Sequence, residues 1–572
     1  MWTYSNIKDV YKLGIANITG FLPFIFIVFI FSMRYSRLVF ILTFFFVLIG
    51  TIFYRVIIRD YFSKLRDKNS IKPSRIEQEL KSRKILIVGA GEAGRTILAE
   101  LFKKNLRKNV VGFIDDDPNK IGKIINGKKI FGGIASIKKI ISDYNINEVF
   151  ITMPSVGSEV INQVITTIKE GNRDISIKIL PSIIEILGDK PLIGILREIG
   201  IDDIIGREEV NVDIASIEKT FNGKTILVTG AGGSIGSEIC KQLLKFKIKK
   251  LIAIGRGEYS IYELIKNLQD YVEYLIYKPE IDFKIADVKD YTLIDNVLKE
   301  SKPDVVFHAA AHKHVPILEY NEVEALKNNV FGTLQILKLS KKHNIKKFVL
   351  ISTDKAVNPV SIMGASKRIA ELITQYYYKE KGLKTTIVRF GNVIGSRGSV
   401  IPLFQEQIKK GGPVTVTHPD IKRYFMTIPE ASILVINASA YSNGGEIFVL
   451  DMGKQHKLID IAKNLIRFYG YEPETDIKII YTGLRPGEKL YEELYYDKGE
   501  NLTKTANEKI WVIKTDKENY TKENIEKFIN MDFSDIIKYN SFEIRKLMKT
   551  LVTEYNYDNY NRYKFDYFKF LN

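Results

Sequence analysis

The segment Val349–Lys367 reads VLISTDKAVNPVSIMGASK and joins an apolar run to a cluster of chemically active side chains. The apolar run predicts a short buried strand, which Thr353, Asp354 and Lys355 follow directly. Neighbouring side chains of a strand point to opposite faces, so Asp354 and Lys355 can serve one site only if the strand ends at Thr353. We therefore expect the chain to turn after Thr353 and to bring both charged side chains to the end of the strand.

A helix is expected to begin near Met363, nine residues after Asp354, with Lys367 one turn further on the same face. This strand and helix resemble the active site of the extended short-chain dehydrogenases/reductases, in which a Ser or Thr and a Tyr-x-x-x-Lys helix face a nicotinamide. Met363 stands in place of that Tyr, and an Asp-Lys pair follows Thr353. Both departures resemble the membrane-bound nucleotide-sugar 4,6-dehydratases of bacterial polysaccharide and glycoprotein pathways.

The resemblance implies a role for each of these side chains. Asp354 would protonate the departing O6, Lys355 would take the C5 proton of the sugar, and Lys367 would hold the nicotinamide ribose. Such chemistry needs a carboxyl group with a raised pKa and a lysine with a lowered pKa, both of which burial can produce. Met363 cannot exchange a proton, so the O4 proton is expected to leave through Thr353, Lys367 or water.

A glycine-rich turn, Gly230–Gly236, follows the predicted strand Thr225–Thr229 and opens a helix. Its pattern of glycines is typical of the dehydrogenase/reductase family and predicts a dinucleotide on the helix N-terminus. The next strand ends without an acid at the ribose position and is followed by Arg256, so the choice between NAD and NADP stays open. The cofactor residues implied by the turn and the resemblance are Gly230, Gly233, Ser234, Ile235, Gly236, Arg256, Asp287, Val288, Ala309, Ala310, Asn329 and Lys367.

Later loops carry residues that the resemblance places around the sugar, the diphosphate and the uridine. Arg423 and Arg485 suit a diphosphate because a guanidinium group pairs two oxygens at once, and Glu488 would accept a hydrogen bond from the uridine ribose. The substrate residues implied in this way are Lys313, His314, Asn392, Arg397, Thr417, Arg423, Arg485 and Glu488.

Another glycine-rich turn lies earlier in the chain, at Gly89–Gly94, after a strand predicted for Lys84–Val88. The following strand is expected to end at Asp115, 21 residues past Gly94, where an acid would meet a ribose hydroxyl. No catalytic side chains accompany this pattern. It supports nucleotide binding and a purely structural or regulatory role equally.

Two apolar runs, Gly14–Met33 and Leu38–Tyr54, are each about long enough to cross a bilayer as a helix. Only four residues separate them, which predicts a transmembrane hairpin. Basic residues flank its outer ends. The positive-inside rule therefore predicts that both ends of the hairpin and the remaining domains lie in the cytoplasm, and the resemblance implies that the membrane is the bacterial inner membrane.

The formal net charge of +18 raises the question of nucleic-acid binding. Lysines are spread along the whole chain without a dense basic block, so a membrane surface or anionic nucleotide substrates explain the charge as well, and no nucleic-acid partner is expected. The single cysteine, Cys240, excludes an internal disulfide. Three histidines from His308 to His314 lack cysteine partners, so no metal site is expected.

The expected architecture is α/β, with two Rossmann-like doubly wound parallel sheets in tandem behind the hairpin. The predicted boundaries are 1–60 for the hairpin, 61–82 and 206–223 for linkers, 83–205 for the first Rossmann-like domain, 224–500 for the catalytic domain and 501–572 for a C-terminal extension.

The resemblance implies a UDP-N-acetylglucosamine 4,6-dehydratase that regenerates a tightly bound NAD or NADP in every cycle. Its product would be a 4-keto-6-deoxy sugar for a surface glycan, and a homo-oligomer is expected. A nucleotide-sugar epimerase and a non-catalytic, membrane-tethered nucleotide-sugar sensor remain alternatives. Retention and inversion at C5 both stay open.

Overall fold

The computed structural model describes residues 83–180, 196–200, 212–496, 501–514 and 521–557, apart from a few single positions, together with scattered positions between 23 and 50. The predicted transmembrane hairpin and the linker at 61–82 therefore lie almost wholly outside the described residues. Within the described part of the chain, no helix combines the length and apolar character needed to cross a bilayer.

The first described domain contains a seven-stranded sheet whose central strands β2, β1, β5 and β6 run parallel. In spatial order the strands are β3 (Ile124–Ile125), β4 (Lys128–Gly132), β2 (Val110–Ile114), β1 (Ile85–Val88), β5 (Glu148–Ile151), β6 (Ser176–Ile179) and β7 (Arg197–Glu198). The longer helices are α4 (Glu92–Lys103), α5 (Ile137–Tyr144) and α6 (Ser158–Gly171). Strands β1 and β5 are buried at every position, as expected for a parallel sheet covered on both faces. The predicted Rossmann-like fold is confirmed here.

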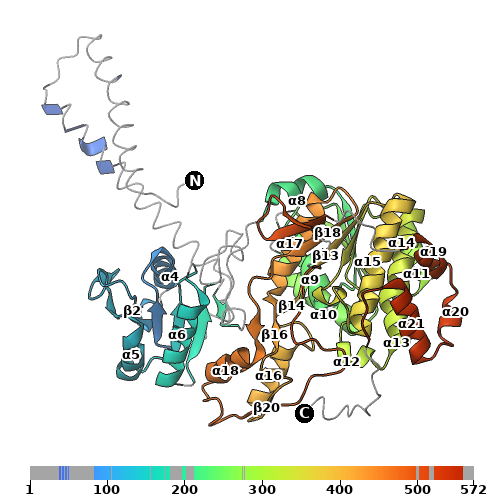
Figure 1. Cartoon of the computed structure of the whole chain (residues 1–572). Coiled ribbons are helices and arrows are strands. Elements are labelled where there is room, and N and C mark those ends of the chain that lie inside the picture. The colour runs from blue at the N-terminus through green and yellow to red at the C-terminus, as the bar shows by residue number, and fades with distance from the viewer. Residues whose placement is uncertain are drawn as a thin grey trace. The chain divides into compact units, whose positions relative to one another are not determined.

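The second domain is built on a nine-stranded sheet (Figure 1). In spatial order its strands are β10 (Glu280–Ile285), β9 (Lys250–Gly255), β8 (Thr225–Thr229), β11 (Val305–His308), β12 (Lys347–Ile351), β13 (Thr385–Arg389), β18 (Glu446–Leu450), β22 (Ile510–Lys514) and β21 (Asn501–Lys504). The first seven strands run parallel to one another. Strand β22 pairs with β18 in the antiparallel sense, and β21 pairs with β22 in the antiparallel sense. The strand order reverses between β8 and β11, and an open α/β sheet binds ligands at the carboxyl ends beside such a point.

Side chains of this sheet alternate between two apolar cores, as a doubly wound sheet requires. In β8, Leu227 belongs to one core, and Ile226 and Val228 belong to the other. The helices on the first core are α11 (Tyr291–Ser301), α14 (Gly332–Lys342) and α15 (Ile362–Lys381). Those on the second core are α8 (Ile214–Phe221), α9 (Ser234–Leu243), α10 (Glu258–Glu273) and α17 (Ile428–Tyr441).

Helix α8 occupies the second half of the segment predicted as a linker at 206–223. Asp213 caps this helix by accepting from the backbone N–H of Ser216 at 3.0 Å. Phe221 is fully buried, with its ring 5.8 Å from that of Phe307 in β11. This part of the segment therefore packs on the catalytic sheet, because one face of the short helix is apolar.

The chain after residue 500 continues the same sheet and the same core. Strand β22 pairs with β18, and β21 pairs with β22. The C-terminal helices are α19 (Lys522–Ile529), α20 (Phe533–Ile536) and α21 (Ser541–Leu551). Their buried residues Ile525, Phe528, Ile544 and Met548 belong to the core that α14 and α15 share.

Short strands form three two-stranded sheets that carry several of the predicted substrate residues. These are β14 (Asn392–Val393) with β17 (Phe425–Met426), β15 (Val414–Val416) with β20 (Ile479–Tyr481), and β16 (Lys422–Arg423) with β19 (His456–Lys457). The helices of this region are α16 (Val400–Lys409) and α18 (Leu458–Phe468).

Candidate active site

A single-turn 3-10 helix, η6 (Asp354–Ala356), follows strand β12. Thr353 caps it, because its hydroxyl accepts a hydrogen bond from the backbone N–H of Lys355 at 3.4 Å. The backbone N–H of Asp354 donates to the carbonyl of Phe390 at 3.1 Å, just after β13. The prediction that the chain turns after Thr353 is confirmed.

Helix α15 begins directly against this turn. Ser361 caps the helix by accepting from the backbone N–H of Gly364 at 3.0 Å. A Cβ atom at Gly364 would lie only 2.2 Å from the carbonyl oxygen of Lys355, so glycine permits this close approach. The helix that carries Met363 and Lys367 is thereby held against the Asp-Lys turn.

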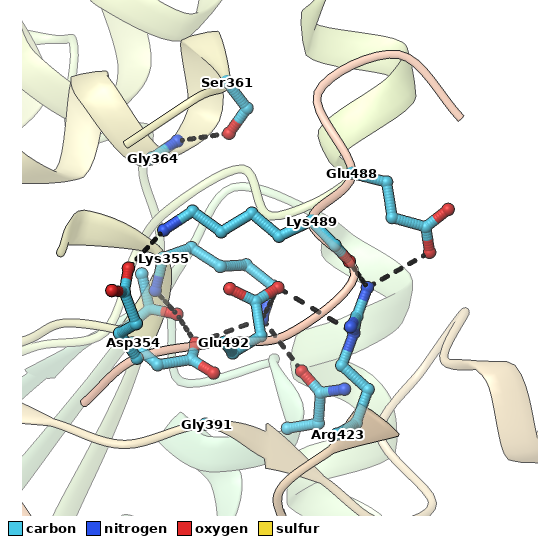
Figure 2. A network of polar contacts seen from close by, with 12 residues as sticks. Asp354, Lys355, Ser361, Gly364, Gly391, Arg423, Glu488, Lys489 and Glu492 are labelled. Atoms are coloured by element: carbon cyan, nitrogen blue, oxygen red, sulfur yellow. Dashed lines mark hydrogen bonds and ion pairs between the residues drawn. The ribbon is translucent and has the colours of Figure 1, made fainter. Parts of the chain in front are cut away.

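Lys355 lies at the centre of a cluster of polar side chains (Figure 2). Its Nζ is 3.0 Å from Asp354 Oδ1 and 2.9 Å from Asn392 Oδ1. It is also 3.5 Å from Glu492 Oε1. Thr353 Oγ1 donates to the same oxygen of Asp354 at 2.8 Å. Glu492 is the member of this cluster that the sequence does not single out.

The second carboxylate oxygen of Asp354, Oδ2, is buried and has no hydrogen-bond partner among the described residues. A Cβ atom at Gly391 would lie 3.0 Å from this oxygen, so the glycine leaves space beside it. A buried carboxylate oxygen without a partner is unfavourable unless a ligand or water meets it. Asp354 Oδ2 is therefore the oxygen of the cluster that a substrate hydroxyl can meet.

The two carboxylates of the cluster control the charge of Lys355. Burial opposes that charge, but Asp354 and Glu492 more than offset the effect and raise the pKa of Lys355. Burial raises the pKa of Glu492, although the ammonium group of Lys355 opposes the rise. The sequence leads us to expect a lowered pKa for Lys355, because burial by itself disfavours the charged ammonium group. The structure differs because two carboxylates surround the ammonium group in the ligand-free protein.

Glu492 lies in the segment after Arg485, where the sequence singles out only Arg485 and Glu488. Glu492 and Glu493 are adjacent acids, and nothing in the sequence distinguishes them. The fold leaves the side chain of Glu492 4% exposed, whereas that of Glu493 is 45% exposed and pairs with Lys489 at 3.0 Å. Burial is therefore the property that assigns Glu492 to the site, and burial depends on the tertiary structure.

Lys367 faces the end of strand β12 from helix α15. Its Nζ donates to the carbonyl of Ile351 at 2.7 Å. Burial lowers the pKa of Lys367 to about 8, against the opposing charge of Glu371. Met363, one turn earlier, is buried and belongs to an apolar core. Lys367 is therefore the side chain of this pair that can exchange a proton near neutral pH.

Asn329 lies in a short π-helix, η5 (Leu326–Phe331), a geometry that is frequent at functional sites. Its amide oxygen accepts from the backbone N–H of His312 at 2.8 Å, and its amide nitrogen donates to the carbonyl of His312 at 3.0 Å. The same nitrogen donates to Ser366 Oγ at 3.0 Å. Asn329 therefore fastens the loop after β11 to helix α15.

The turn Gly230–Gly236 joins β8 to α9, as predicted. Gly230 has a φ of 65°, and a Cβ atom there would lie 2.6 Å from the backbone nitrogen of Ala310. A Cβ atom at Gly236 would lie 2.3 Å from the carbonyl oxygen of Gly230. Gly233 precedes the first turn of α9, which contains Ser234, Ile235 and Gly236. The turn packs closely on Ala309 and Ala310 and fits a dinucleotide whose pyrophosphate lies on the helix N-terminus.

Three further residues assigned to the cofactor follow the carboxyl ends of neighbouring strands. Arg256 is exposed between β9 and α10. After β10, Asp287 accepts from the backbone N–H of Lys289 at 2.9 Å. Val288 is buried, and a Cβ atom at Gly332 would lie 3.0 Å from it. All three lie at the carboxyl ends of the parallel strands, where the glycine-rich turn also lies.

Lys313 and His314 contact the loop after β14. Lys313 Nζ donates to Ser396 Oγ at 3.2 Å. His314 lies so close to Gly398 that a Cβ atom there would be 2.5 Å from its ring. Burial lowers the pKa of both Lys313 and His314. The two predicted substrate residues are therefore brought to one loop.

Arg397, on the same loop, contacts the cofactor turn. Its guanidinium Nη1 donates to the carbonyl of Gly232 at 3.0 Å, and its backbone N–H donates to Ser234 Oγ at 3.3 Å. Arg397 therefore joins the predicted substrate loop to the glycine-rich turn in the ligand-free protein.

Arg423 is buried and holds the segment around Glu488 and Glu492. Its Nη2 donates to the carbonyl of Lys489 at 2.7 Å and to Glu488 Oε1 at 3.3 Å. Its Nη1 donates to the carbonyl of Leu490 at 3.2 Å, and its Nε is 3.8 Å from Glu492 Oε1. Arg423 thus links the predicted substrate residue Glu488 to the cluster around Lys355 (Figure 2).

Arg485 and Thr417 follow β20 and β15, the two strands of one small sheet. The backbone N–H of Arg485 donates to Glu488 Oε2 at 3.1 Å, and burial lowers the pKa of the Arg485 side chain. The hydroxyl of Thr417 is buried without a hydrogen-bond partner within the described ranges. Because the two strands pair in parallel, the segments that carry these predicted substrate residues leave the small sheet at the same end.

His308, at the end of β11, and His312, in the loop after it, have separate protein partners. The ring nitrogens of His308 are 2.8 Å and 3.0 Å from the hydroxyl oxygens of Thr229 and Thr333. Burial lowers the pKa of His308 to about 3, so its ring is neutral. His312 is instead 3.1 Å from Glu324. Among the residues that the structure describes, no three His, Cys, Asp or Glu side chains are grouped as a metal site requires.

Comparisons with known proteins point to polysaccharide synthesis. A family model described as polysaccharide biosynthesis protein matches residues 226–515, and one described as CoA-binding domain matches residues 3–180. The capsular polysaccharide biosynthesis protein CapD of Staphylococcus aureus is 45% identical over 482 residues, covering 83% of this chain and 77% of CapD.

Two further relatives extend this comparison. The probable polysaccharide biosynthesis protein EpsC of Bacillus subtilis is 46% identical over 416 residues, covering 72% of this chain and 68% of EpsC. A UDP-glucose 4-epimerase of Rickettsia canadensis is 35% identical over 277 residues, covering 48% of this chain and 78% of that protein. Together with the fold and the cluster at the end of β12, these matches show that the chain belongs to the polysaccharide biosynthesis protein family.

Proposed function

We propose that this protein is a nucleotide-sugar 4,6-dehydratase that acts on UDP-N-acetylglucosamine with NAD or NADP. The observation that carries the proposal is the cluster of Thr353, Asp354 and Lys355 at the end of β12. Removing a hydride from C4 requires one proton acceptor for O4. Loss of water additionally requires a base at C5 and an acid at the C6 hydroxyl, and this cluster supplies both types of group.

The fit of the glycine-rich turn supports a dinucleotide cofactor. Gly230–Gly236 would hold its pyrophosphate, and Lys367 would hold the nicotinamide ribose. When bound, the nicotinamide would take the C4 hydride and return it to C6. The O4 proton would leave together with the C4 hydride, through Thr353, Lys367 or water. A pKa of about 8 keeps part of Lys367 as the amine near neutral pH, which suits that role.

Asp354 and Lys355 share one proton. The resting form of the pair and the form that dehydration needs differ in which of the two residues carries it. In the resting form, the ammonium group of Lys355 donates to the carboxylate of Asp354 over 3.0 Å. Transfer of that proton produces a neutral amine and a neutral carboxylic acid. A sugar that excludes water favours the neutral pair, because desolvation disfavours the charged forms.

Each member of the neutral pair can then act on the sugar. The amine of Lys355 takes the C5 proton from the 4-keto intermediate. The carboxylic acid of Asp354 gives its proton to the C6 hydroxyl, which leaves as water. The C4 carbonyl makes the C5 proton acidic, so C5 can lose its proton only after the C4 hydride has left. When the hydride returns to C6, C5 takes up a proton from the ammonium group of Lys355 or from water, and the proton released from O4 replaces the one that Asp354 gave to the departing water.

A nucleotide-sugar C4 epimerase is the second candidate. The 35% identity to a protein named UDP-glucose 4-epimerase favours it. Epimerisation returns the hydride to C4 and needs neither a base at C5 nor an acid at C6. The Asp354–Lys355 pair therefore favours the dehydratase.

Proton NMR of the full-length protein in detergent, incubated with UDP-N-acetylglucosamine in deuterated water, tests the proposal. A dehydratase produces a new C6 methyl signal with deuterium at C5 and needs no added reductant. The C5 configuration of that product separates retention from inversion. A changed C4 configuration with the C6 hydroxyl retained would instead identify an epimerase. Binding of cofactor and sugar without turnover would favour a non-catalytic sensor, which the inert side chain of Met363 would suit.

We further propose that residues 1–60 anchor the protein in the bacterial inner membrane, with the catalytic domain in the cytoplasm. The two apolar runs, the basic residues that follow the second run and the net charge of +18 support this arrangement.

A further inference from the structure

Two carboxylates lie within 3.5 Å of Lys355 Nζ, and the proposed dehydration uses only that of Asp354 (Figure 2). The second belongs to Glu492, whose side chain is 4% exposed. Its Oε1 is 3.5 Å from Lys355 Nζ and 3.8 Å from Arg423 Nε. A carboxylate buried to this extent has lost most of its contact with water, and the two cations that the fold places beside it compensate for that loss.

We propose that Glu492 is a positioning residue that holds the proton of Lys355 in the ligand-free protein and thereby sets the pH at which Lys355 becomes a free amine. The proposal rests on the proposed function in one respect, because it takes Lys355 as the base. The charge on Lys355 itself is a property of the ligand-free protein and can be measured without any reaction.

The backbone of Glu492 is fixed from two sides. Gln455 Nε2 donates to the carbonyl of Glu492 at 2.8 Å. Arg423 donates to the carbonyls of Lys489 and Leu490, which precede Glu492 in the same segment. Glu492 is therefore held at this position by contacts that do not involve Lys355, so its carboxylate meets Lys355 already oriented.

The charged groups that face Glu492 come from three elements. Asp354 and Lys355 belong to η6, Arg423 to β16 and Lys489 to the segment of Glu492 itself. The ammonium group of Lys489 is engaged elsewhere, at 3.0 Å from both the carbonyl of Val357 and the carboxylate of Glu493. Arg423 donates its Nη groups to backbone carbonyls and to Glu488. Of the cations that face Glu492, Lys355 is the one whose proton is transferred in the proposed reaction.

A negative charge at this distance favours the protonated form of Lys355. The pair of Asp354 and Lys355 is active when it holds one proton, and it loses that proton at high pH. The charge of Glu492 moves this loss to higher pH. Replacing Glu492 by the isosteric Gln removes the charge, so the loss is expected to move to lower pH by at least about one unit.

Competitive labelling of lysines with acetic anhydride over a pH series measures this effect directly, because only the free amine reacts. Mass spectrometry of the peptide that contains Lys355 gives the pH of half-maximal labelling. We expect Glu492→Gln to lower this midpoint by at least about one unit. The matched control is Glu493→Gln, which removes an adjacent but exposed carboxylate, and its midpoint should equal that of the parent. An unchanged midpoint in Glu492→Gln would overturn the proposal.

A shorter acid at the same position extends the test. Glu492→Asp keeps the charge but withdraws it by one methylene, so a midpoint between those of the parent and Glu492→Gln is expected. If Glu492→Gln does not fold, Glu492→Asp decides in its place, and a midpoint equal to that of the parent counts against the proposal.

Steady-state kinetics separate this inference from the proposed function. In Glu492→Gln the basic limb of the kcat/KM–pH profile, which reports the free enzyme, should shift with the labelling midpoint, while KM for the nucleotide sugar at a pH below both midpoints changes less than about twofold. If the parent forms no dehydrated sugar but the labelling midpoint moves as expected, the proposed function fails and the role of Glu492 stands. If the parent dehydrates the sugar and the midpoint does not move, only the role of Glu492 fails.

Discussion

Two lysines near the end of β12, Lys367 and the partly exposed Lys355, show how neighbouring side chains determine their charge. Lys367 donates to a neutral backbone carbonyl, and burial lowers its pKa to about 8. Lys355 has Asp354 at 3.0 Å and Glu492 at 3.5 Å, and these carboxylates outweigh burial and raise its pKa. At the scale of single residues, the first lysine can accept a proton near neutral pH, whereas the second must first pass its proton to Asp354.

Substitutions of the Asp-Lys pair test these roles. Lys355→Ala should lower the rate of deuterium uptake at C5 by at least about a hundredfold while cofactor stays bound, because the base is lost. Asp354→Asn should mainly slow the loss of water, so that the 4-keto intermediate accumulates. NMR of the products in deuterated water measures both effects.

Lys410→Ala serves as the control for this pair of variants, because Lys410 is 71% exposed and, among the described residues, pairs with Glu406 of the helix that ends just before it. It should behave like the parent. Parent-like turnover in both Lys355→Ala and Asp354→Asn would show that the assigned roles are wrong.

At the scale of elements, the C-terminal helices fix the position of helix α15. The backbone N–H of Ile362, at the start of α15, donates to Glu319 at 2.6 Å. Arg545 of α21 is 3.0 Å from the same carboxylate. Further along α15, Arg368 pairs with Glu554 at 2.9 Å. The helix that carries Lys367 is therefore held in place by residues from the far end of the chain.

Removal of the guanidinium group at Arg545 tests this arrangement. Arg545→Ala leaves Glu319, with its side chain 3% exposed, without its charge partner. Breaking a buried pair in this way should lower the free energy of unfolding by about 3 kcal/mol. Urea-induced unfolding of the full-length protein in detergent measures the change.

A surface pair at the end of α20 provides the comparison for Arg545. Lys538 is 74% exposed and pairs with Asp535 at 3.0 Å. Lys538→Ala should change the stability by no more than about 0.5 kcal/mol. Equal effects of the two substitutions would show that Arg545 does not hold α15.

At the scale of the whole molecule, the chain combines two Rossmann-like domains that differ in the side chains near their glycine-rich turns. In the first domain, Asp115 is close to the glycine-rich turn but accepts from the backbone N–H of Ala90 at 2.8 Å and pairs with Lys120 at 3.2 Å. The turn of the second domain lies on the same sheet as the Asp-Lys cluster. The Asp-Lys cluster thus accompanies the second turn, so the proposed chemistry belongs to the second domain.

The proposed anchor leads to a prediction about the whole molecule. The full-length protein should sediment with membranes and be released by detergent, whereas a protein that starts at residue 61 should remain in the supernatant. The shortened protein should still dehydrate UDP-N-acetylglucosamine, because none of the proposed catalytic residues lies before residue 61. Ultracentrifugation followed by the NMR assay measures both properties. A full-length protein found in the supernatant would contradict the proposed anchor.

Local patterns in the sequence were enough for much of the fold and for part of the site. The turn at Gly230–Gly236 and the turn after Thr353 were predicted because contiguous residues set the backbone geometry at both places. The parallel sheets followed from apolar runs that alternate with helical patterns. The Asp354–Lys355 pair was assigned because the strand before it and the helix after it resemble the active site of a known family.

Only the tertiary structure decided the charge of Lys355 and the place of the C-terminal segment. Glu492 and Lys355 are far apart in sequence, and no local pattern distinguishes the buried Glu492 from the exposed Glu493. Strands β21 and β22 and helix α21 complete a sheet and a core whose other members lie much earlier in the chain. Local conformation depends on neighbouring residues, whereas burial and the charges that surround a side chain depend on segments that meet only after the chain has folded.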